Sequence, residues 1–515
     1  MRTPEQVLQW IHKAWKKEYT LAFFVTVLMG LLIHMPVMVQ DLPNHDGLDS
    51  LYFDQNMITS GRWFLTIACG ISSYFNLPWL ISLLSLLYLG LASVCLTEIL
   101  QLRSKVSIFV VSGLLISFPA LACSFAYVFT LDGYMLALLL SIMAVWIAQR
   151  GKYGYLIGAV CLGCSMGIYQ AYLPISILLC LYLTARALIE EDSIKGVWRK
   201  VFPLLKMGIL GIVFYFVMLY FLLFLQGKEL ASYQGINGEG AAGQGLLTSF
   251  KLVYQDFFTF LMKGKVLFHN GASAAAGLVL GGMFLWTIFL LARQKGRYKK
   301  PLFYLVLLGY AVLIPLVVNY ILILSGALNY HMIMRYQWVF LLILVIALAD
   351  QYAGNIAQWA ILVAGTVLIF SYAVMDNIGY QNLHQKYEKT YAYCVRLLDR
   401  IENTPGYYQG IPVAMIGVVG DEAFPTTDLS ADVTWPLIGL NGDWLLYTGD
   451  NYELFIKHYL GASLNILDTS YMGEIYYSKE YQEMDSFPGP NSTKVVDGIL
   501  YVHTENPDRT IQFEN

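Results

Sequence analysis

Eleven long apolar runs constrain the fold of this chain more than any other feature of its sequence. Each has the ~20 residues that a helix needs to cross a bilayer, or somewhat fewer. Only 13% of all residues are charged, about half of the ~25% that is usual in soluble proteins. We therefore predict a polytopic α-helical membrane protein with about eleven transmembrane helices in a lipid bilayer. The net charge of −3 gives no indication of a nucleic-acid partner. The runs lie near residues 21–39, 78–98, 106–124, 133–149, 153–169, 172–186, 207–225, 272–292, 302–322, 337–350 and 357–375.

Positive charges predict the orientation of these helices. With a cytoplasmic N-terminus, the inner segments collect most of the Lys and Arg residues, including the cluster Arg293, Lys295, Arg297, Lys299 and Lys300. The outer loops hold only Arg62, Lys228, Lys251, Lys263, Lys265 and Arg335. This asymmetry follows the positive-inside rule. We therefore expect a multi-pass plasma membrane protein whose C-terminal region is extracytoplasmic. The extracytoplasmic location of the C-terminal region depends on 337–350, the shortest run, because without that span the region would be cytoplasmic.

The chain is predicted to have two domains. Residues 1–375 form the membrane domain, with outer loops at 40–77 and 226–271, and the second loop includes a predicted interfacial helix. Residues 376–515 open with a helical pattern over 387–401 and continue with strand-like runs that are separated by turns rich in Gly and Asp. This order indicates a small α+β domain. The strand-like runs are 412–419, 465–467 and 495–503.

The first outer loop carries the densest group of carboxylates, Asp41, Asp46, Asp49 and Asp54. If residues 48–58 are helical, Asp46 and Asp49 share a face near the helix start, where the unpaired N–H groups favour negative charge. Carboxylates that face Arg62 across a short loop can deprotonate a hydroxyl and hold a phosphate. The alternative is an ordinary polar hairpin between two membrane helices, because short motifs such as this one often occur by chance.

Ionisable groups at membrane depth are costly and usually functional. Most of those in this chain avoid that cost because they lie at the ends of the predicted spans, and several polar residues lie at the outer ends. Asp132 follows the start of one span, as a helix cap or as a site residue. Tyr169 and Gln170 lie at an outer turn, where the amide could bond sugar hydroxyls. His331 and Arg335 lie in a later outer loop. Arg335 either anchors at lipid headgroups or clamps a lipid phosphate through two hydrogen bonds.

Three groups of residues resemble the bacterial type II glucosyltransferase family, which is best known for decorating O-antigen. The first group is His45-Asp46, Asp49 and Ser60-Gly61-Arg62-Trp63, and the second is the segment 165–170. The third comprises the tail segments 484–488 and 497–502. His45 stands where many members carry the first of two adjacent acids, so either Asp46 or Asp49 is the key carboxylate.

The resemblance implies the GT-C membrane glycosyltransferase architecture, in which the first outer loop carries the catalytic acid. It also implies a polyprenyl-phosphate sugar donor, such as undecaprenyl phosphate glucose, and a cell-surface polysaccharide acceptor. Asp46 or Asp49 would then be the general base. Arg62 and Arg335, with His331, would bind the donor phosphate. The substrate-binding residues would be His45, Trp63, Asp132, Tyr169 and Gln170.

Two alternatives remain open. The first concerns metal use: a divalent cation, Mg²⁺ or Mn²⁺, could bind to oxygen ligands from Asp46, Asp49 and Asp132. A flippase or exporter of a lipid-linked glycan would also need many spans and outer Arg residues. A transporter, however, is expected to have broken helices, and often paired repeats, through the membrane centre. Here the polar residues concentrate at one face, which favours chemistry at the surface.

Overall fold

The structure is a computed structural model that describes residues 3–51, 54–231, 245–324, 330–416, 428–441 and 453–504. The chain divides into two compact units. The first comprises residues 1–41, 54–377 and 436–438, and the second comprises residues 42–53, 378–435 and 439–515. The sequence prediction placed the boundary at 375/376 and the whole loop 40–77 in the membrane domain. By its contacts, segment 42–53 instead groups with the C-terminal residues.

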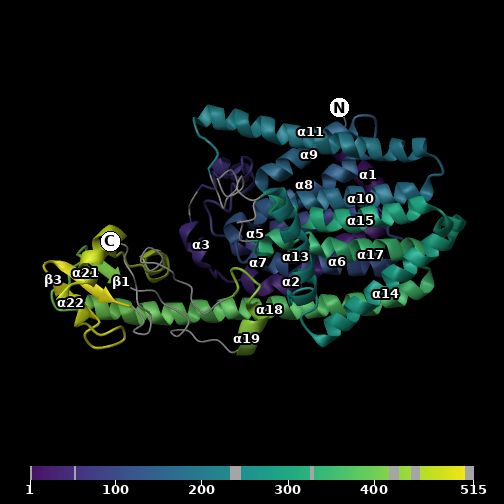
Figure 1. Cartoon of the computed structure of the whole chain (residues 1–515). Helices are drawn as coiled ribbons and strands as arrows, with labels where there is room; N and C mark the ends of the chain where they lie inside the picture. Colours follow the sequence, from purple (N-terminus) through teal and green to yellow (C-terminus); the bar gives the residue numbers. More distant parts are fainter. Residues whose placement is uncertain are drawn as a thin grey trace. The chain divides into compact units, whose positions relative to one another are not determined.

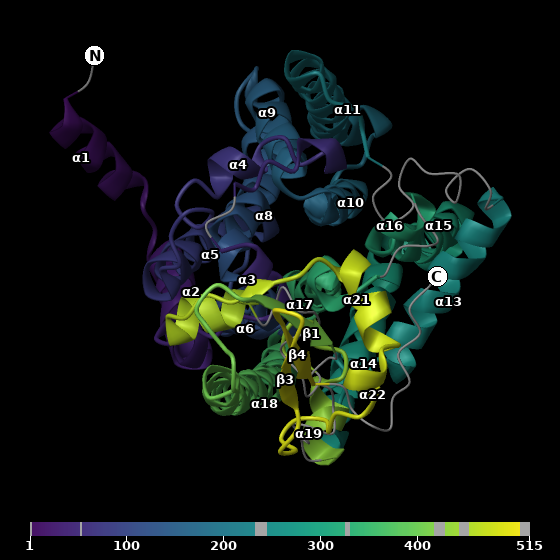
Figure 2. The ribbon, with the colours of Figure 1, turned by 90° about the vertical axis from the view of Figure 1, so that its left-hand side faces the viewer.

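The first unit is helical, and Figures 1 and 2 together label its α-helices. Before residue 190 it contains α1 (Pro4–Ala14), α2 (Lys17–Met38), η1 (Ile58–Ser60), α4 (Leu65–Ala68), α5 (Pro78–Leu100), α6 (Lys105–Ser117), α7 (Pro119–Phe125), α8 (Val128–Ala148), α9 (Gly154–Ile168), η2 (Gln170–Tyr172) and α10 (Leu173–Glu190). It continues with α11 (Ile194–Gln226), α13 (Leu246–Lys263), α14 (Gly271–Arg293), η3 (Gln294–Lys299), α15 (Pro301–Val318), α16 (Ile321–Leu324), η4 (Met332–Arg335) and α17 (Trp338–Tyr352).

Within the described residues, nine helices are long and apolar enough to cross a membrane, or ten if the bent pair α6–α7 forms one span. This confirms a polytopic helical membrane protein. The count of eleven is not confirmed, because α9 has only 15 residues and falls among the shorter apolar helices. The shortest predicted run, 337–350, is helical in α17, and with η4 it belongs to an apolar stretch of 21 residues.

The predicted continuous span 106–124 is interrupted. α6 ends at Ser117, α7 begins at Pro119, and the two helices are bent by 46°. Phe118 has extended backbone angles, as expected for the residue before a proline. Pro119 itself begins α7 because it lacks the N–H that a helix interior would use. All seven residues of α7 are buried.

Small residues bring α9 close to its neighbours α8 and α11, which lie on either side of it (Figures 1 and 2). A Cβ atom at Gly158 would lie 2.6 Å from the carbonyl oxygen of Ala144 in α8. On the other side, a Cβ atom at Gly163 would lie 2.4 Å from the ring of Phe214 in α11. Glycines permit this close approach of helix backbones in membranes. The glycines of Gly154–Ile168 therefore allow this apolar helix to pack closely against both neighbours.

The last helix of the membrane region is longer than predicted. α18 runs without interruption from Asn355 to Glu402, whereas the sequence predicts a span over 357–375 and, in the C-terminal domain, a helical pattern over 387–401. The intervening residues 376–386 contain no proline, and the single Gly379 lowers helix stability by only about 1 kcal/mol. The helix therefore continues from the first unit into the second, with the division after Asn377.

The second unit is an α+β domain, as predicted. Besides the end of α18, its elements are α3 (His45–Asp49), β1 (Pro412–Ile416), α19 (Asp428–Thr434), η5 (Ile456–Leu460), β2 (Asn465–Ile466), α21 (Thr469–Tyr476), α22 (Lys479–Gln482), β3 (Thr493–Val496) and β4 (Ile499–His503). The sheet order is β2-β1-β4-β3. β1 is parallel to both neighbours, and β3 is antiparallel to β4.

The predicted strand 495–503 is in fact a hairpin. β3 and β4 are joined by Asp497 and Gly498, both with positive φ (48° and 79°). An Asp-Gly pair with these angles is a strong signal for a two-residue hairpin turn. The predicted strands near 412 and 465 are confirmed in β1 and β2, while residues 417–419 of the first lie outside the described residues.

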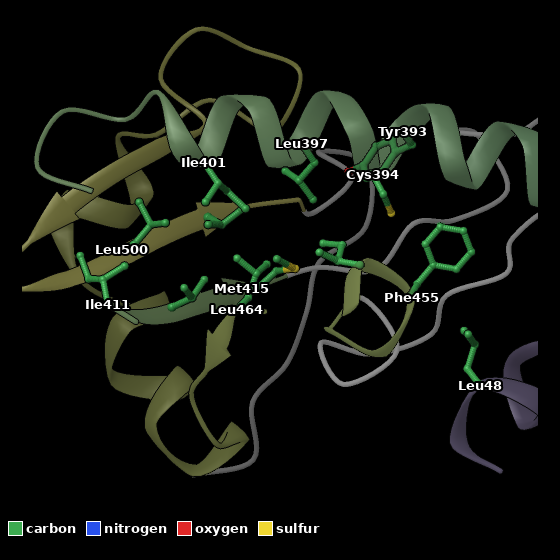
Figure 3. Packing of buried hydrophobic residues seen from close by; sticks show 13 residues of the cluster. Leu48, Tyr393, Cys394, Leu397, Ile401, Ile411, Met415, Phe455, Leu464 and Leu500 are labelled. Carbon is green, nitrogen blue, oxygen red and sulfur yellow. The ribbon is translucent and has the colours of Figure 1, made fainter. Parts of the chain in front are cut away.

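Two hydrophobic clusters cover opposite faces of this sheet. Val413 and Met415 of β1 enter one cluster, and Ala414 and Ile416 enter the other, as expected for a strand in which alternate side chains point to opposite faces. Figure 3 shows the first cluster, which also takes in the inner face of the end of α18. One member, Leu48, comes from α3 near the start of the chain.

Candidate active site

The two candidate catalytic carboxylates lie on α3 in the second unit. The predicted helix 48–58 is wrong in its bounds: the helix is His45–Asp49, a separate 3-10 turn follows at Ile58–Ser60, and residues 52–53 lie outside the described residues. The helix starts there because the side chain of Asn44 accepts a hydrogen bond of 2.7 Å from the N–H of Gly47, as a capping residue does. Asp46 and Asp49 are exposed. The His45 side chain lies outside the described part.

Arg62 lies in the first unit, directly after a turn that requires glycine. Gly61 has a φ of 82°, and a Cβ atom there would lie 2.5 Å from the hydroxyl of Tyr215 and 2.6 Å from the amide nitrogen of Gln170. The Arg62 guanidinium is 5.3 Å from the ring centre of Tyr169, a distance that allows a cation–π interaction. The turn therefore presents the half-buried guanidinium beside an aromatic wall.

Tyr169 and Gln170, which were predicted as substrate-binding residues, form this wall and its hydrogen bonds. The Tyr169 ring stacks on Tyr134 with 4.3 Å between ring centres. The Gln170 amide donates to the carbonyl of Ser60 and to the hydroxyl of Tyr215, each at 3.1 Å. Tyr215 in turn donates to the carbonyl of Gly61 at 3.1 Å. Gln170 thus connects the Arg62 turn with α11.

Trp63 is a packing residue in this structure. It is 8% exposed, its ring makes an edge contact with Phe214 at 6.1 Å, and Gly167 leaves the space that the ring fills. The neighbouring backbone N–H of Phe64 donates to the carbonyl of Gly167 at 2.8 Å. Trp63 therefore fixes the turn against α9, and its predicted contact with substrate stays a prediction.

Asp132 is not a helix cap. α8 begins at Val128 after Tyr127, and Asp132 is the fifth residue of the helix, 2% exposed. Its carboxylate accepts a hydrogen bond of 2.6 Å from the hydroxyl of Ser72. Ser72 follows α4, so Asp132 holds the far end of the segment that begins at Arg62. The alternative of a role in the site remains a prediction.

Arg335 is already paired. Its guanidinium donates to both carboxylate oxygens of Asp256 at 2.7 and 2.8 Å, and it lies 3.7 Å from the ring centre of Tyr330 and 4.5 Å from that of Phe260. Arg335 is 8% exposed. A two-point contact of this kind is among the strong hydrogen-bond arrangements. His331 precedes the 3-10 turn that carries Arg335.

Two tyrosines and an asparagine that could not be predicted from the sequence connect these groups. Tyr320 donates its hydroxyl hydrogen bond to the backbone carbonyl of Gln170. The adjacent Asn319 donates to Asp256 at 3.0 Å and accepts from Tyr330 at 3.2 Å. Burial raises the pKa of the Tyr330 phenol above its ordinary value, so this hydroxyl remains a donor. We call these residues, with Gln170, Tyr215, Asp256 and Arg335, the polar network.

The structure therefore brings together Arg62, Tyr169 and Gln170, and links them through the polar network to Arg335. It places Asp46 and Asp49 in the second unit. In the described parts of the chain, three or more His, Cys, Asp or Glu residues do not gather into a group that could hold a metal ion. Involvement of Mg²⁺ or Mn²⁺ stays an open alternative.

Comparison with known protein families places the chain in a family. The family described as Glucosyl transferase GtrII matches residues 35–348, which is more than half of the chain and includes α3, the Arg62 turn and Arg335. It ends before the tail segments 484–488 and 497–502. No curated protein and no solved structure matches the chain. The length of the family match shows that this membrane protein belongs to the glucosyl transferase GtrII family.

Proposed function

We propose that the protein transfers glucose from a polyprenyl-phosphate donor to a cell-surface glycan on the outer face of the plasma membrane. The observation that supports this most directly is the family match, which covers both candidate carboxylates and Arg62. The many apolar helices support a lipid-linked donor, because such a donor lies in the same bilayer as the enzyme. The distribution of positive charge supports action on the outer face.

In the proposed reaction, Asp46 or Asp49 acts as general base. The carboxylate takes the proton of an acceptor hydroxyl, and the acceptor oxygen forms a new bond to the anomeric carbon. The bond between that carbon and the phosphate oxygen breaks, and the polyprenyl phosphate leaves with the electron pair. Both carboxylates are exposed, which such a role requires.

Arg62 is the cation best suited to the departing phosphate. Its charge would stabilise the negative charge that develops as the bond to phosphate breaks, and Tyr169 and Tyr134 form an aromatic surface beside it. Arg335 is neutralised by Asp256, so in this proposal it acts by holding the polar network together unless the donor displaces Asp256. Gln170 and Tyr169 orient the sugar.

A direct assay separates transfer from transport. The purified protein in nanodiscs is supplied with polyprenyl-phosphate glucose labelled in the sugar, and with a crude cell-wall glycan. We expect label to appear in the glycan and free polyprenyl phosphate to accumulate in equal amount. In liposomes, movement of the intact labelled lipid between leaflets without transfer would instead establish the flippase. The bent α6–α7 pair is the feature, among the described helices, that a transporter would share.

Replacing Gly61 by Ala tests the Arg62 turn. Any side chain at a φ of 82° is strained, and here it would also displace the Tyr215 hydroxyl and the Gln170 amide. We expect a fall in transfer rate of ~10²-fold, because a displacement of about 1 Å in a site can have that effect. Gly151→Ala is the matched control, since Gly151 has a φ of 65° but nothing within 4 Å of its Cβ position. Equal activity of the two variants would contradict the role of the turn.

A further inference from the structure

Leu48 lies between the two candidate carboxylates, Asp46 and Asp49, in the sequence. Its side chain is buried, whereas both carboxylates are exposed. Leu48 is 1% exposed and belongs to the first hydrophobic cluster of the second unit. Figure 3 shows its side chain on the same side of the cluster as Phe455. The other buried members are Tyr393, Cys394, Leu397, Ile401, Ile411, Val413, Met415, Phe455, Ile456, Leu464, Leu500 and Val502.

Because α3 is a helix, the burial of Leu48 also determines the direction in which Asp46 and Asp49 point. On a helix, residues three apart share a face, so Asp46 and Asp49 point the same way. A residue advances by about 100° along a helix, which places Leu48 on the side away from their common face. Burying Leu48 therefore turns the carboxylates outward, in agreement with their exposure.

α3 cannot hold this direction by itself. It has five residues, and a helix that short is not stable in isolation. The Asn44 cap satisfies one N–H at its start, and Asn44 is itself 1% exposed. Within residues 44–49, the cap and Leu48 are thus the two buried side chains, and the other described side chains are half-buried or exposed.

We propose that the C-terminal domain serves the transfer reaction by holding α3 through Leu48. Leu48 is a positioning residue: it touches neither donor nor acceptor, and its packing determines where the carboxylates of Asp46 and Asp49 point. The effect of Leu48 on catalysis rests on the proposed function. The anchoring of α3 by Leu48 does not depend on that function. It assigns the β2-β1-β4-β3 domain a role in the chemistry of a loop that precedes it by several hundred residues.

The test compares two leucines of the same core. Leu48→Ala and Leu500→Ala remove the same atoms from one cluster, and Leu500 lies on β4, away from α3. We expect Leu48→Ala to lower kcat at least tenfold with the KM for the lipid donor within twofold. We expect Leu500→Ala to lower the unfolding midpoint of the domain while kcat, measured well below that midpoint, stays within threefold. Leu48→Met, which keeps the volume, should retain the wild-type kcat.

A second measurement reports anchoring without catalysis. A nitroxide label at Ser50→Cys, in a background in which the half-buried Cys161, Cys164 and Cys180 are Ser, gives an immobilised spectrum if α3 is held. Leu48→Ala should release a mobile component that Leu500→Ala does not. If the wild type transfers no sugar but the label behaves as expected, the proposed function fails and the anchor stands. Wild-type kcat in Leu48→Ala, or an equal loss in Leu500→Ala, would overturn the positioning role.

Discussion

Replacing both Asp46 and Asp49 by Asn is expected to lower the rate of glucose transfer by ~10²–10⁴-fold, the usual contribution of a general base. The carboxamide keeps the size and polarity of the side chain but cannot take a proton. Both positions are exposed, and the loss of negative charge near the start of α3 should lower the free energy of unfolding by about 1 kcal/mol or less. The measurement is the initial rate with saturating labelled donor, together with thermal unfolding of each variant.

The single variants decide which carboxylate is the base. We expect one of Asp46→Asn and Asp49→Asn to account for most of the loss and the other to have a smaller effect. Asp41→Asn is the control, because Asp41 is an exposed carboxylate of the same loop that accepts a hydrogen bond from Asn76. Full activity of the double variant would remove both residues from the mechanism.

The largest expected effect on stability is that of Asp256→Ala. This change leaves the guanidinium of Arg335, which is 8% exposed, without its two-point partner. Removing one member of a buried pair typically costs about 3–5 kcal/mol. The Asp256 side chain is 26% exposed, so water can partly replace it, and we expect about 2–3 kcal/mol. Thermal unfolding in nanodiscs measures the difference.

A double variant tests whether the loss of stability comes from leaving one charge of the Asp256–Arg335 pair unpaired. Asp256→Leu combined with Arg335→Met removes both charges, and we expect it to regain most of the stability that either single change loses. The control is Glu191→Ala, which breaks an ion pair with Lys200 whose side chains are 23% and 43% exposed, and which should cost about 1 kcal/mol or less. If Asp256→Ala were no more harmful than Glu191→Ala, the polar network would not depend on this pair.

The membrane helices could be predicted from the sequence because a long apolar run has few alternatives to a helix in a bilayer. The points at which a helix bends, or continues beyond an apolar run, are harder to predict from the sequence. The bend at Phe118 follows from Pro119, but a proline within an apolar run can also be accommodated in one helix. The continuity of α18 does not follow from the hydrophobic pattern, because the sequence becomes more polar after residue 375 and such a change often marks the end of a membrane helix. The turn at Asp497 and Gly498, in contrast, has a local signal, because an Asp-Gly pair between two strand-like runs is typical of a hairpin.

Less of the candidate site could be predicted. Gly61, Arg62 and Gln170 stood out through their types and positions, but Tyr215 and Tyr320 lie in apolar runs or beside them and carry no local signal. Asp256 is the only acid in its predicted interfacial helix, and a lone acid among aromatic residues indicates a basic partner elsewhere. Identifying that partner as Arg335 required the tertiary structure. The same is true of Leu48, whose burial depends on residues hundreds of positions away.

The composition of that core has a consequence for the order of folding. One cluster joins Leu48 with Leu500 and Val502, so its contacts span most of the chain. At ~5–20 residues per second during synthesis, α3 leaves the ribosome on the order of a minute before β4 exists. Until the strand at Ile499–His503 pairs with β1, Leu48 has an incomplete core to enter. A nascent chain therefore exposes α3 before the core that buries Leu48 is complete, and α3 is anchored only after β4 has been made.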